Sequence, residues 1–434
     1  MKKIKIVGMG YVGQTLAAVM AEAEFTVYGI DEDSRVIDAM KNRKSHVHET
    51  GLNEILEKRI DKNLFAGKWQ EFENDADVIV IAVPTPFDKK TRKPNLSYVE
   101  TVLQNCAKTL KKGQTIILRS TVPLGTTRNV AKTILEKSGL VAGKDFYLAF
   151  APERTIQGAA LRELTILPQI IGGINTESVQ ATTKIFEQIT PIIVPVTSLE
   201  AAEMVKLVDN SFRDVKFAYA NELAELCEKA NLNAFEVIRS ANRGYQRNNI
   251  PLPSPGVGGG CLTKDPHIFA SSATKYGQEL TMINDGRKVN EAAPKRIAER
   301  LKKLNISDKT ILICGFAFKG EPPTNDMRES PTLDLVTELK GKCKNILGYD
   351  PLVEKWKIEG LGLKYIEKLK NGIESADVAI FMINHKEFLD PEISKLFAKM
   401  PKNAVIVDGW GLFDKRAIEA IGIKYIGVGI GDNY

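Results

Sequence analysis

The sequence predicts an α/β protein in which two doubly wound parallel-sheet domains are joined by a helical domain with one long central helix. Three observations predict this fold class. Apolar strand-like runs alternate with helical segments before residue 197, and a similar alternation resumes near residue 295. Between them lies an uninterrupted helical stretch, residues 197–231. A chain of 434 residues is too long for one core, and we expect domains at residues 1–197, 198–294 and 295–434.

The first strand, Lys3–Val7, leads into a glycine-rich turn and a helix that runs to about Glu24. The turn consists of Gly8, Met9, Gly10, Tyr11, Val12 and Gly13. Gly8 permits the tight turn, Gly10 lets a pyrophosphate approach the backbone, and Gly13 lets helix and strand pack closely. The helix N-terminus offers N–H groups and a positive dipole to the phosphates. Strand, turn and helix together predict a Rossmann-like dinucleotide-binding domain.

A second strand, Phe25–Ile30, ends at Asp31, 18 residues after Gly13. A carboxylate at this position can bond both ribose hydroxyls and repels a 2′-phosphate. The sequence therefore predicts NAD, and not NADP, as the cofactor. Arg35 could lie along the adenine or reach a phosphate, and a plain surface arginine is the alternative.

Two later strands of this domain, Asp77–Val83 and Thr115–Arg119, end in loops rich in Pro, Ser and Thr. In open parallel sheets, ligands lie just beyond the carboxyl ends of strands. The residues expected near the nicotinamide end of the cofactor are Val83, Pro84, Thr85, Ser120 and Thr121. Turn formation and helix capping are alternative roles for the hydroxyl residues. Further strands are expected at residues 146–149, 169–172 and 192–196, and a loop with Glu153 and Arg154 follows the first of these.

The central stretch, residues 197–231, contains neither Pro nor Gly, and Thr197 stands three residues before Glu200, as in a capping box. Its apolar residues cover more than one face, which is typical of a helix buried by several neighbours. Lys206, Asn210 and Arg213 follow one another at spacings of four and three, so they form one polar stripe. A solvated face is one interpretation of this stripe. A polar cleft that holds a ligand is the other, and the apolar surroundings favour it.

A loop rich in Pro and Gly, residues 250–265, follows a shorter helical segment at residues 234–241. Its glycines 256, 258, 259 and 260 let the backbone wrap closely against another surface. The loop ends with Cys261, Lys264 and Asp265. Because nearby positive charge favours the reactive thiolate, Cys261 is a candidate nucleophile. A small buried cysteine is the alternative.

Composition excludes several classes of function. The formal net charge of +6 is spread along the chain without a basic tract, so we expect no nucleic-acid partner. Five cysteines without a CxxC pair indicate a reducing compartment. The N-terminal apolar run reaches glycines within six residues, which is not typical of a signal peptide, and no apolar stretch reaches the length of a membrane span. We therefore expect a cytoplasmic protein. His46 and His48 are interpreted as surface loop residues, and no metal site is expected.

Seven motifs in this order resemble the UDP-glucose/GDP-mannose (nucleotide-sugar) 6-dehydrogenase family. They are GMGYVG, VPTP, STVPLGTT, APER, EMVKLVDNSFRDVKFAYANE, PGVGGGCLTKD and FAFK…MRESP, and they cover nearly the whole chain. The resemblance implies that the protein oxidises the C6 alcohol of a nucleotide sugar to the carboxylate, with two NAD and one water.

The resemblance also implies roles for particular residues. Cys261 would be the covalent nucleophile, and Lys206 and Asn210 would stabilise the oxyanions of the thiohemiacetal and thioester intermediates. Asp265 and Thr121 would position the water and handle protons.

Other residues are implied to bind the sugar or the cofactor. Glu153, which the resemblance also implies to be catalytic, would lie close to the reacting sugar, and Lys264 would help to hold NAD. The substrate contacts implied by the resemblance are Glu153, Arg154, Lys206, Asn210, Arg213, Arg243, Gly256, Gly258, Lys319 and Arg328.

The PER and FRDV segments resemble the members that act on N-acetylhexosamine sugars, where Arg154 and Arg213 would recognise the sugar or its acetamido group. This favours UDP-N-acetylmannosamine, with UDP-N-acetylglucosamine next and UDP-glucose as the alternative. The resemblance implies dimerisation through the long helix, so we expect a homodimer or a higher homo-oligomer in which Arg243 reaches the neighbouring subunit's site.

The last part of the chain predicts a second α/β unit, with strands at residues 310–315, 345–349, 378–383, 404–407 and 425–428. Residues 315–320 resemble the glycine-rich turn at residues 8–13 but lack its glycine spacing, so no second NAD is expected. This part resembles the family's nucleotide-binding domain, with Lys319 and Arg328 as phosphate or sugar contacts. Trp410 follows Asp408-Gly409 where some relatives have an arginine, which puts that arginine contact in doubt.

Two other functions remain open at this point. A two-electron β-hydroxyacid-type dehydrogenase would share the first domain and a long helix with Lys and Asn, although the thiol loop and second α/β unit argue against it. A regulatory protein could instead bind NAD and a sugar nucleotide without turnover. The yield of NADH for each sugar consumed separates the three: two, one or none.

Overall fold

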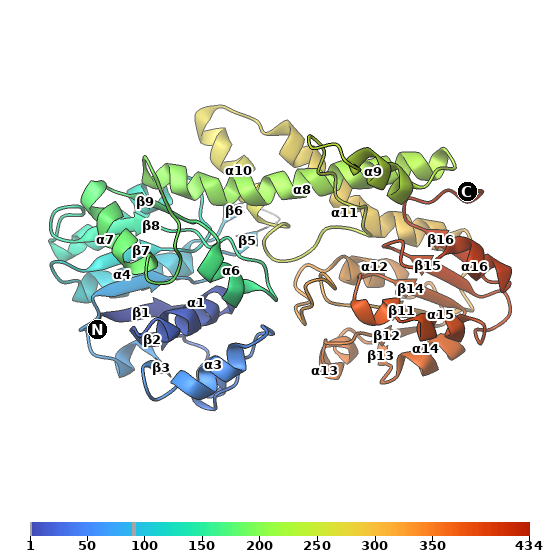
Figure 1. Ribbon diagram of the computed structural model, residues 1–434, viewed down its shortest axis with the longest axis horizontal. Helices are drawn as coiled ribbons and strands as arrows, with labels where there is room; N and C mark the ends of the chain where they lie inside the picture. Colours follow the sequence, from blue (N-terminus) through green and yellow to red (C-terminus); the bar gives the residue numbers. More distant parts are fainter. Residues whose placement is uncertain (1, 89–92) are drawn as a thin grey trace. The chain divides into compact units, whose positions relative to one another are not determined.

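The computed structural model describes residues 2–88 and 93–434 (Figure 1). The chain forms two compact units, Met1–Asp209 with His267–Glu279 and Asn210–Pro266 with Leu280–Tyr434. Each unit is built around its own parallel or mainly parallel sheet, which confirms the predicted fold class. The three domain boundaries derived from the sequence stay a prediction.

The sheet of the first unit has the strand order β10-β9-β8-β7-β4-β1-β2-β3. The strands are β1 (Lys3–Val7), β2 (Thr26–Ile30), β3 (Leu64–Gly67), β4 (Val78–Ile81), β7 (Thr115–Leu118), β8 (Tyr147–Phe150), β9 (Gln169–Gly173) and β10 (Ile193–Val196). Neighbouring strands are parallel except β8 and β9, which run antiparallel. Reading from β3 to β8, the order is that of a doubly wound dinucleotide-binding sheet, with its switch point between β1 and β4.

Helices cover both faces of this sheet (Figure 1). They are α1 (Tyr11–Glu22), α2 (Ser34–Lys41), α3 (Leu52–Arg59), α4 (Ser97–Thr109), α5 (Lys132–Leu135), α6 (Ala160–Ile166) and α7 (Thr176–Phe186). A short hairpin, β5 (Phe87–Asp88) and β6 (Lys93–Pro94), and a π-helical turn, Thr127–Ala131, complete the unit. Val78 and Val80 of β4 point into one core, whereas Ile79 and Ile81 point into the other. The uninterrupted apolar run of β4 is thus explained by burial on both faces.

The long helix α8 spans Leu199–Lys229 without a break. Its N-terminus corrects one prediction, because the hydroxyl of Ser198, and not that of Thr197, accepts a hydrogen bond from Ala201 N at 3.1 Å. The predicted capping partner, Glu200, instead binds Arg128 at 2.6 Å. At the other end Asn231 adopts a left-handed φ of 55°, as expected where a helix terminates. The helices that follow are α9 (Ala234–Asn242), α10 (Asp265–Ala273) and α11 (Thr281–Lys302).

The sheet of the second unit is parallel throughout, in the order β13-β12-β11-β14-β15-β16. Its strands are β11 (Thr310–Cys314), β12 (Asn345–Tyr349), β13 (Lys364–Tyr365), β14 (Val378–Phe381), β15 (Val405–Asp408) and β16 (Lys424–Gly427). The helices around it are α12 (Pro331–Leu339), α13 (Lys355–Glu359), α14 (Leu369–Ser375), α15 (Pro391–Phe397) and α16 (Lys415–Ala420). This is again the doubly wound order, with the switch point between β11 and β14.

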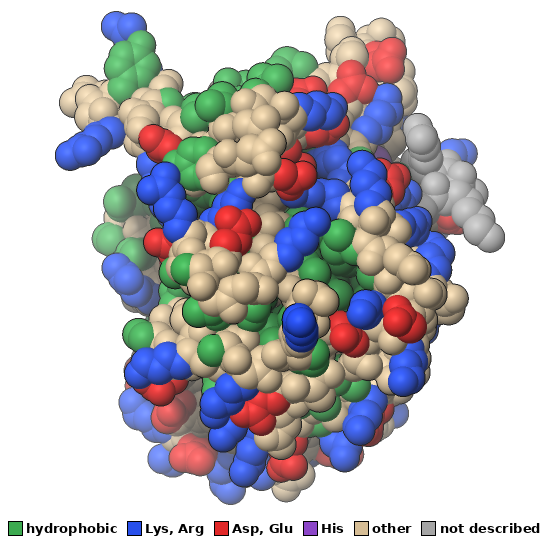
Figure 2. All heavy atoms as spheres, turned by 90° about the vertical axis from the view of Figure 1, so that its right-hand side faces the viewer, with side chains coloured by type: hydrophobic (Ala, Val, Ile, Leu, Met, Phe, Trp, Pro, Cys, Tyr) green, Lys and Arg blue, Asp and Glu red, His purple; other side chains and the backbone are tan. Residues whose placement is uncertain are grey.

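The surface carries charges of both signs. On the face drawn in Figure 2, Lys and Arg side chains are mixed with Asp and Glu side chains. Within residues 2–88 and 93–434, every helix is too short or too polar to cross a lipid bilayer.

Candidate functional site

The turn after β1 is shaped by two glycines that have no room for a side chain. Gly8 has a φ of +94°, and a Cβ on it would lie 2.8 Å from the carbonyl oxygen of Ala82. A Cβ on Gly13 would lie 1.8 Å from Gly8 O. Gly10 differs, because apart from Gly10 itself and the chain next to it, no atom of the described residues lies within 4 Å of the position that its Cβ would take. The turn is therefore packed tightly at Gly8 and Gly13 and open at Gly10, the residue directly before α1. These residues fit the pyrophosphate of a dinucleotide.

The carboxylate of Asp31 organises the same turn. Its Oδ2 accepts from Met9 N at 2.7 Å, and its Oδ1 accepts from Asp33 N at 2.9 Å. Arg35 binds Asp33 at 2.7 Å, and this bond holds the pKa of Asp33 at about 2. The Arg35 side chain is 91% exposed. Contacts of Asp31 and Arg35 with the cofactor stay a prediction.

Gly10→Ala tests whether this opening holds phosphate. Because Gly10 has an unstrained φ of −68° and open space around it, the variant should fold and unfold as the wild type does. Its methyl group would occupy the space needed by the pyrophosphate, so NAD affinity should fall at least about tenfold, or about 1.4 kcal/mol. Calorimetric titration with NAD measures this. Wild-type affinity would contradict it, and Gly13→Ala, with its impossible contact to Gly8 O, should instead destabilise the fold.

The loops after β4 and β7 are tied to each other by the predicted hydroxyl residues. Thr85 Oγ1 donates to the carbonyl oxygen of Thr121 at 2.6 Å, and Ser120 Oγ donates to Val83 O at 2.7 Å. Thr85 and Ser120 are buried, and Thr121 is partly exposed. These bonds bring four of the residues predicted at the nicotinamide end, with Pro84 between two of them, to one edge of the sheet.

Tyr11 of the glycine-rich turn takes part in a cluster that sequence reasoning missed. Its hydroxyl bonds the carboxylate of Glu49 and accepts from Gly158 N at 2.9 Å, while Glu49 accepts from the same N–H at 2.8 Å. Burial, followed by the hydrogen bond to Glu49, raises the pKa of Tyr11. The cluster fixes the loop that contains Glu153 and Arg154 against the start of α1. The sequence hints at this cluster only through Glu49, an acidic residue close to His46 and His48.

Glu153 and Lys206 are brought together, as their common assignment to the sugar site requires. Lys206 Nζ lies 3.6 Å from Glu153 Oε2, and both residues are buried. Burial opposes the charged form of Glu153, but the charges of Lys206 and then Arg119 outweigh it and hold its pKa below the usual value. The buried Arg119 donates to Gln169 Oε1 at 3.0 Å, and burial lowers its pKa to about 10. Arg119 was missed, although an arginine that ends the apolar run TIILR is a visible signal.

Arg154 pairs with an acidic residue of α8, since its Nε lies 2.8 Å from Asp209 Oδ2. It also donates to Pro168 O at 3.4 Å. The guanidinium is thus held in place, and its contact with a sugar stays a prediction.

Glu203 was also missed, although it extends the polar stripe of α8 by one turn before Lys206. Its carboxylate accepts from Gly125 N at 2.5 Å, from Thr127 N at 2.7 Å and from the Thr127 hydroxyl at 2.6 Å. The residue is buried, and burial raises its pKa to about 7. Glu203 therefore links the loop of Ser120 and Thr121 to the helix that carries Lys206.

The raised pKa predicts a pH-dependent stability. A carboxyl group whose pKa rises from 4.5 to about 7 on folding binds its proton more tightly in the folded state. Its contribution is therefore present below about pH 4.5 and is lost as the pH rises through about 7, roughly 3 kcal/mol in all. Glu203→Gln should remove this part of the pH dependence. Unfolding midpoints at about pH 5 and about pH 8 measure it for both proteins.

The matched control is Glu200→Gln, one turn away on α8. The hydrogen bond to Arg128 lowers the pKa of Glu200, so its contribution to stability has the opposite dependence on pH. An unchanged pH dependence in Glu203→Gln would show that the carboxylate, and not the carboxylic acid, is the stable form in this site.

In the second unit, Asn210 and Lys264 both bind Asp265. Asn210 Nδ2 donates to Asp265 Oδ2 at 2.5 Å, and Lys264 Nζ lies 2.6 Å from Oδ1. Asp265 is fully buried and begins α10. The structure therefore joins two predicted catalytic residues with one predicted cofactor ligand. The contact of Lys264 with NAD stays a prediction.

The glycine-rich loop packs against the segment that starts with FAFK. A Cβ on Gly258 would lie 2.5 Å from Glu329 O, and one on Gly259 would lie 2.8 Å from the ring of Phe318. Larger residues would push the loop away, which explains these two glycines. Gly260 differs from the prediction, because the position of a Cβ on it is open space. Cys261 is exposed at the end of this loop, and its carbonyl oxygen accepts from Asp265 N at 2.9 Å.

Arg328 lies within electrostatic reach of the thiol. Hydrogen bonds to Asp326 raise the pKa of Arg328 most, and the charge of Cys261 raises it further. Lys319 lies over the ring of Phe318, with 5.6 Å between Nζ and the ring centroid.

Arg213 on α8 and Arg243 at the end of α9 are exposed. Their contacts with a substrate stay predictions.

Trp410 stands at the position where some relatives have an arginine. Its indole Nε1 donates to Met382 O at 3.0 Å, directly after β14. Its backbone N–H donates to the buried Asp408, whose pKa is raised by burial. An indole in the loop after β15 offers an apolar surface in place of a charge.

No three His, Cys, Asp or Glu side chains of the described chain are grouped as a metal ion would require. His46 is exposed and shares a 2.8 Å hydrogen bond with Gln14 Nε2.

Three family models match successive parts of the chain. They are described as the NAD binding domain, the central domain and the UDP binding domain of the UDP-glucose/GDP-mannose dehydrogenase family, and they match residues 2–190, 200–292 and 312–415.

Individual relatives match over nearly full length. A UDP-N-acetyl-D-mannosamine dehydrogenase of Campylobacter jejuni is 33% identical and covers 91% of this chain and 98% of its own. An NDP-N-acetyl-D-galactosaminuronic acid dehydrogenase of Ralstonia solanacearum is 30% identical, with 96% of this chain and 98% of its own covered. The solved structure of UDP-D-ManNAc dehydrogenase from Pyrococcus horikoshii superposes with a TM-score of 0.89, at 30% identity, over 99% of this chain and 100% of that one.

Proposed function

The chain belongs to the UDP-glucose/GDP-mannose dehydrogenase family, and from that premise we propose that it oxidises C6 of UDP-N-acetyl-D-mannosamine to the carboxylate. NAD is its cofactor, and a UDP-sugar is its substrate class. The observation that carries the reaction type is the exposed thiol of Cys261 at the end of a tightly packed glycine-rich loop. An alcohol is oxidised to an aldehyde without a thiol, whereas a thiol lets the second oxidation proceed through a bound thioester.

Cys261 acts after the first oxidation has produced the C6 aldehyde. Its sulfur adds to the aldehyde carbon, a C–S bond forms, and the carbonyl oxygen becomes an oxyanion. Lys206 and Asn210, one helical turn apart on α8, stabilise this negative charge. NAD, when bound, accepts the hydride in each oxidation step.

Water completes the reaction by attacking the resulting thioester. The C–S bond then breaks, the carboxylate leaves, and the thiol of Cys261 is restored. Asp265, which Asn210 and Lys264 hold in place, positions this water together with Thr121 and accepts its proton. One alcohol, one water and two NAD thus yield one carboxylate, two NADH and three protons.

The charge on Lys206 is supported by its surroundings. The pKa of Glu153 is lowered by the nearby charges, which favours its carboxylate, and this carboxylate lies 3.6 Å from Lys206 Nζ. An ammonium that is already in place when the oxyanion forms needs no reorganisation, which makes it effective in stabilising the transition state.

The sugar specificity that we propose rests on the relatives and on two arginines. Relatives named for N-acetylated sugars match over 91% and 96% of the chain. Arg154 and Arg213 are proposed to recognise the acetamido sugar. Lys319 and Arg328 are proposed to bind the nucleotide diphosphate, and the backbone at Gly256 and Gly258 is proposed to approach the substrate.

A panel of nucleotide sugars tests the substrate. UDP-N-acetylmannosamine, UDP-N-acetylglucosamine, UDP-glucose and GDP-mannose are each incubated with the protein and NAD, and NADH absorbance is followed. UDP-N-acetylmannosamine should give the highest kcat/KM, and UDP-N-acetylglucosamine is the next candidate. A preference for UDP-glucose would overturn the proposed substrate, and reduction of NAD by none of them would overturn the function.

We also propose a homodimer formed through α8, with Arg243 close to the partner's substrate. The helix exposes large apolar side chains at intervals of four and seven residues, so they share one face. They are Met204, Val208, Phe212, Tyr219 and Leu226. Sedimentation measures the oligomeric state, and a monomer at micromolar concentration would contradict the proposal.

Because Cys261 must stay a thiol, we propose the cytoplasm as the compartment.

A further inference from the structure

A chain of buried hydrogen bonds in the second unit starts beside Cys261. Arg287 of α11 donates from one nitrogen, Nη1, to Leu262 O at 3.3 Å and to Asp214 Oδ1 at 2.7 Å. Asn290, one turn further along α11, donates to the same Asp214 oxygen at 2.9 Å. Arg287 thus connects the peptide group after Cys261 to the middle of α8.

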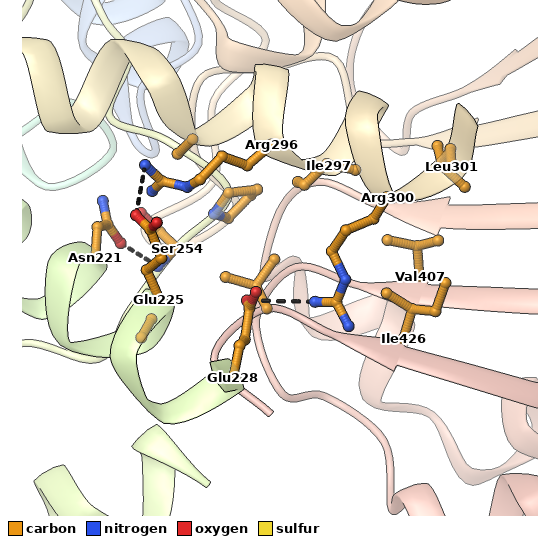
Figure 3. Close-up of a pocket in the computed structure, with 14 residues that line it drawn as sticks. Asn221, Glu225, Glu228, Ser254, Arg296, Ile297, Arg300, Leu301, Val407 and Ile426 are labelled. Carbon is orange, nitrogen blue, oxygen red and sulfur yellow. Dashed lines mark hydrogen bonds and ion pairs between the residues drawn. The ribbon is translucent and has the colours of Figure 1, made fainter. Parts of the chain in front are cut away.

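The chain of hydrogen bonds continues to the other end of the loop. Asn221 of α8 donates to Asn290 Oδ1 at 2.9 Å, and its own Oδ1 accepts from Ser254 N at 2.9 Å. Figure 3 shows Asn221 pointing toward Ser254, with the hydrogen bond between them. The four side chains therefore bond the loop at Ser254 and at Leu262, on either side of its glycines and of Cys261.

Stability alone is a poor explanation of this network. Arg287 and Asp214 are at most 2% exposed, and a buried ion pair contributes little net stability compared with apolar packing. In the described part of the chain, Arg287 Nε and Asp214 Oδ2 are buried without a hydrogen-bond partner. Such unpaired atoms reduce the stability further. What the network supplies, and apolar side chains do not, is directional bonding to two peptide groups of the loop.

The loop needs such bonds because glycine leaves its backbone unusually free. Gly256, Gly258, Gly259 and Gly260 each lose much conformational entropy when the loop is ordered. Cys261 follows these glycines directly and is exposed, so its position depends on how well the backbone of this loop is ordered.

We propose that Arg287, Asp214, Asn290 and Asn221 form a positioning network that holds Cys261 in the geometry required for attack on the aldehyde. The catalytic consequence rests on the proposed function, whereas the ordering of the loop does not. These four residues act through Leu262 and Ser254, and they are not assigned any contact with substrate or cofactor.

Two variants interrupt the network at different ends. Arg287→Lys keeps a positive charge beside Asp214, but an ammonium lacks the planar fork that fixes the direction of both bonds. Asn221→Ala removes the bond to Ser254 without leaving a buried charge. A small pocket of about 20 Å³, lined by Asn221 and Ser254 among others, can admit one water there, so this variant should fold.

Arg296→Lys is the matched control. Arg296 also lies on α11 and joins it to α8, since its Nη1 lies 3.5 Å from Glu225 Oε2 (Figure 3). Like Arg287, it joins α11 to α8 by an ion pair, although a more exposed one, and it does not bond Leu262. The control should therefore behave as the wild type in both measurements below.

Amide hydrogen exchange of residues 254–265 measures the order of the loop without turnover. Arg287→Lys and Asn221→Ala should exchange this segment at least about tenfold faster, with the rest of the chain unchanged. For the oxidation, kcat should fall about 10- to 100-fold at an unchanged KM for NAD, because displacing a nucleophile slows the chemical step.

Three outcomes would overturn the proposal. They are wild-type exchange of the loop in the folded variants, faster exchange spread over the whole chain, and faster loop exchange with an unchanged kcat. Failure of the proposed function would be recognised separately, because the wild-type protein would then oxidise no nucleotide sugar.

Discussion

Cys261→Ser abolishes formation of the sugar carboxylate, with a loss of at least roughly 10³-fold in kcat, and leaves NAD binding intact. A serine hydroxyl is a far weaker nucleophile than a thiolate unless a base activates it, and an ester to serine is hydrolysed less readily than a thioester. Loss of a covalent nucleophile has effects of this size or larger in other enzymes. NAD affinity should be unchanged, since Gly8, Gly13 and Asp31 are untouched.

The measurement is quantification of the sugar acid by mass spectrometry, combined with calorimetric titration of NAD. Cys343→Ser is the control, because Cys343 is a partly exposed thiol of the same unit with no assigned role. The control should retain wild-type turnover. Cys261→Ser with wild-type acid production would remove the covalent step.

Lys206→Met lowers kcat by about 10²- to 10³-fold, the range seen when one group that stabilises an oxyanion is removed. The methionine retains the length of the side chain but brings no charge. Without the ammonium, Glu153 loses the strongest charge that favours its ionised form, so the pKa of Glu153 should rise. Below that raised pKa, Glu153 becomes protonated, and the acid side of the pH–rate profile should shift upward.

Steady-state kinetics as a function of pH tests both parts of this prediction. Lys229→Met is the control on the same helix, since Lys229 is an exposed residue paired with Glu225 at 2.9 Å. A surface pair of this kind contributes little, so the control should be as active as the wild type. If Lys206→Met raised only KM, Lys206 would bind substrate and transition state equally, and its oxyanion role would be wrong.

Many elements of the fold could be predicted, because neighbouring residues in the sequence determine each of them. The strand β1 and the turn at Gly8 were placed correctly, since a tight turn and a close helix contact leave no other residue possible. Apolar runs such as β4 were recognisable because both faces are buried. The short strands β3 and β13 were not predicted, because four and two residues carry too little pattern. Their pairing depends on the sheet beside them.

The candidate site could be predicted only in part, for a related reason. Cys261, Lys206 and Asn210 stood out through a glycine run and a helical spacing, and the family prediction is confirmed. Arg119 and Glu203 gain their roles from partners far along the chain, such as Thr127, which lies 76 residues from Glu203. No local pattern encodes such pairs. Their roles follow from burial, which only the folded chain defines.

The central claim is that one protein site removes four electrons from a single carbon through a thioester on Cys261. The most direct test is the molar ratio of NADH formed to UDP-sugar consumed, measured by absorbance and chromatography on the same reaction. We expect a ratio of two, with the sugar carboxylate as the sole product. A ratio of one, with an aldehyde or ketone as product, would contradict it.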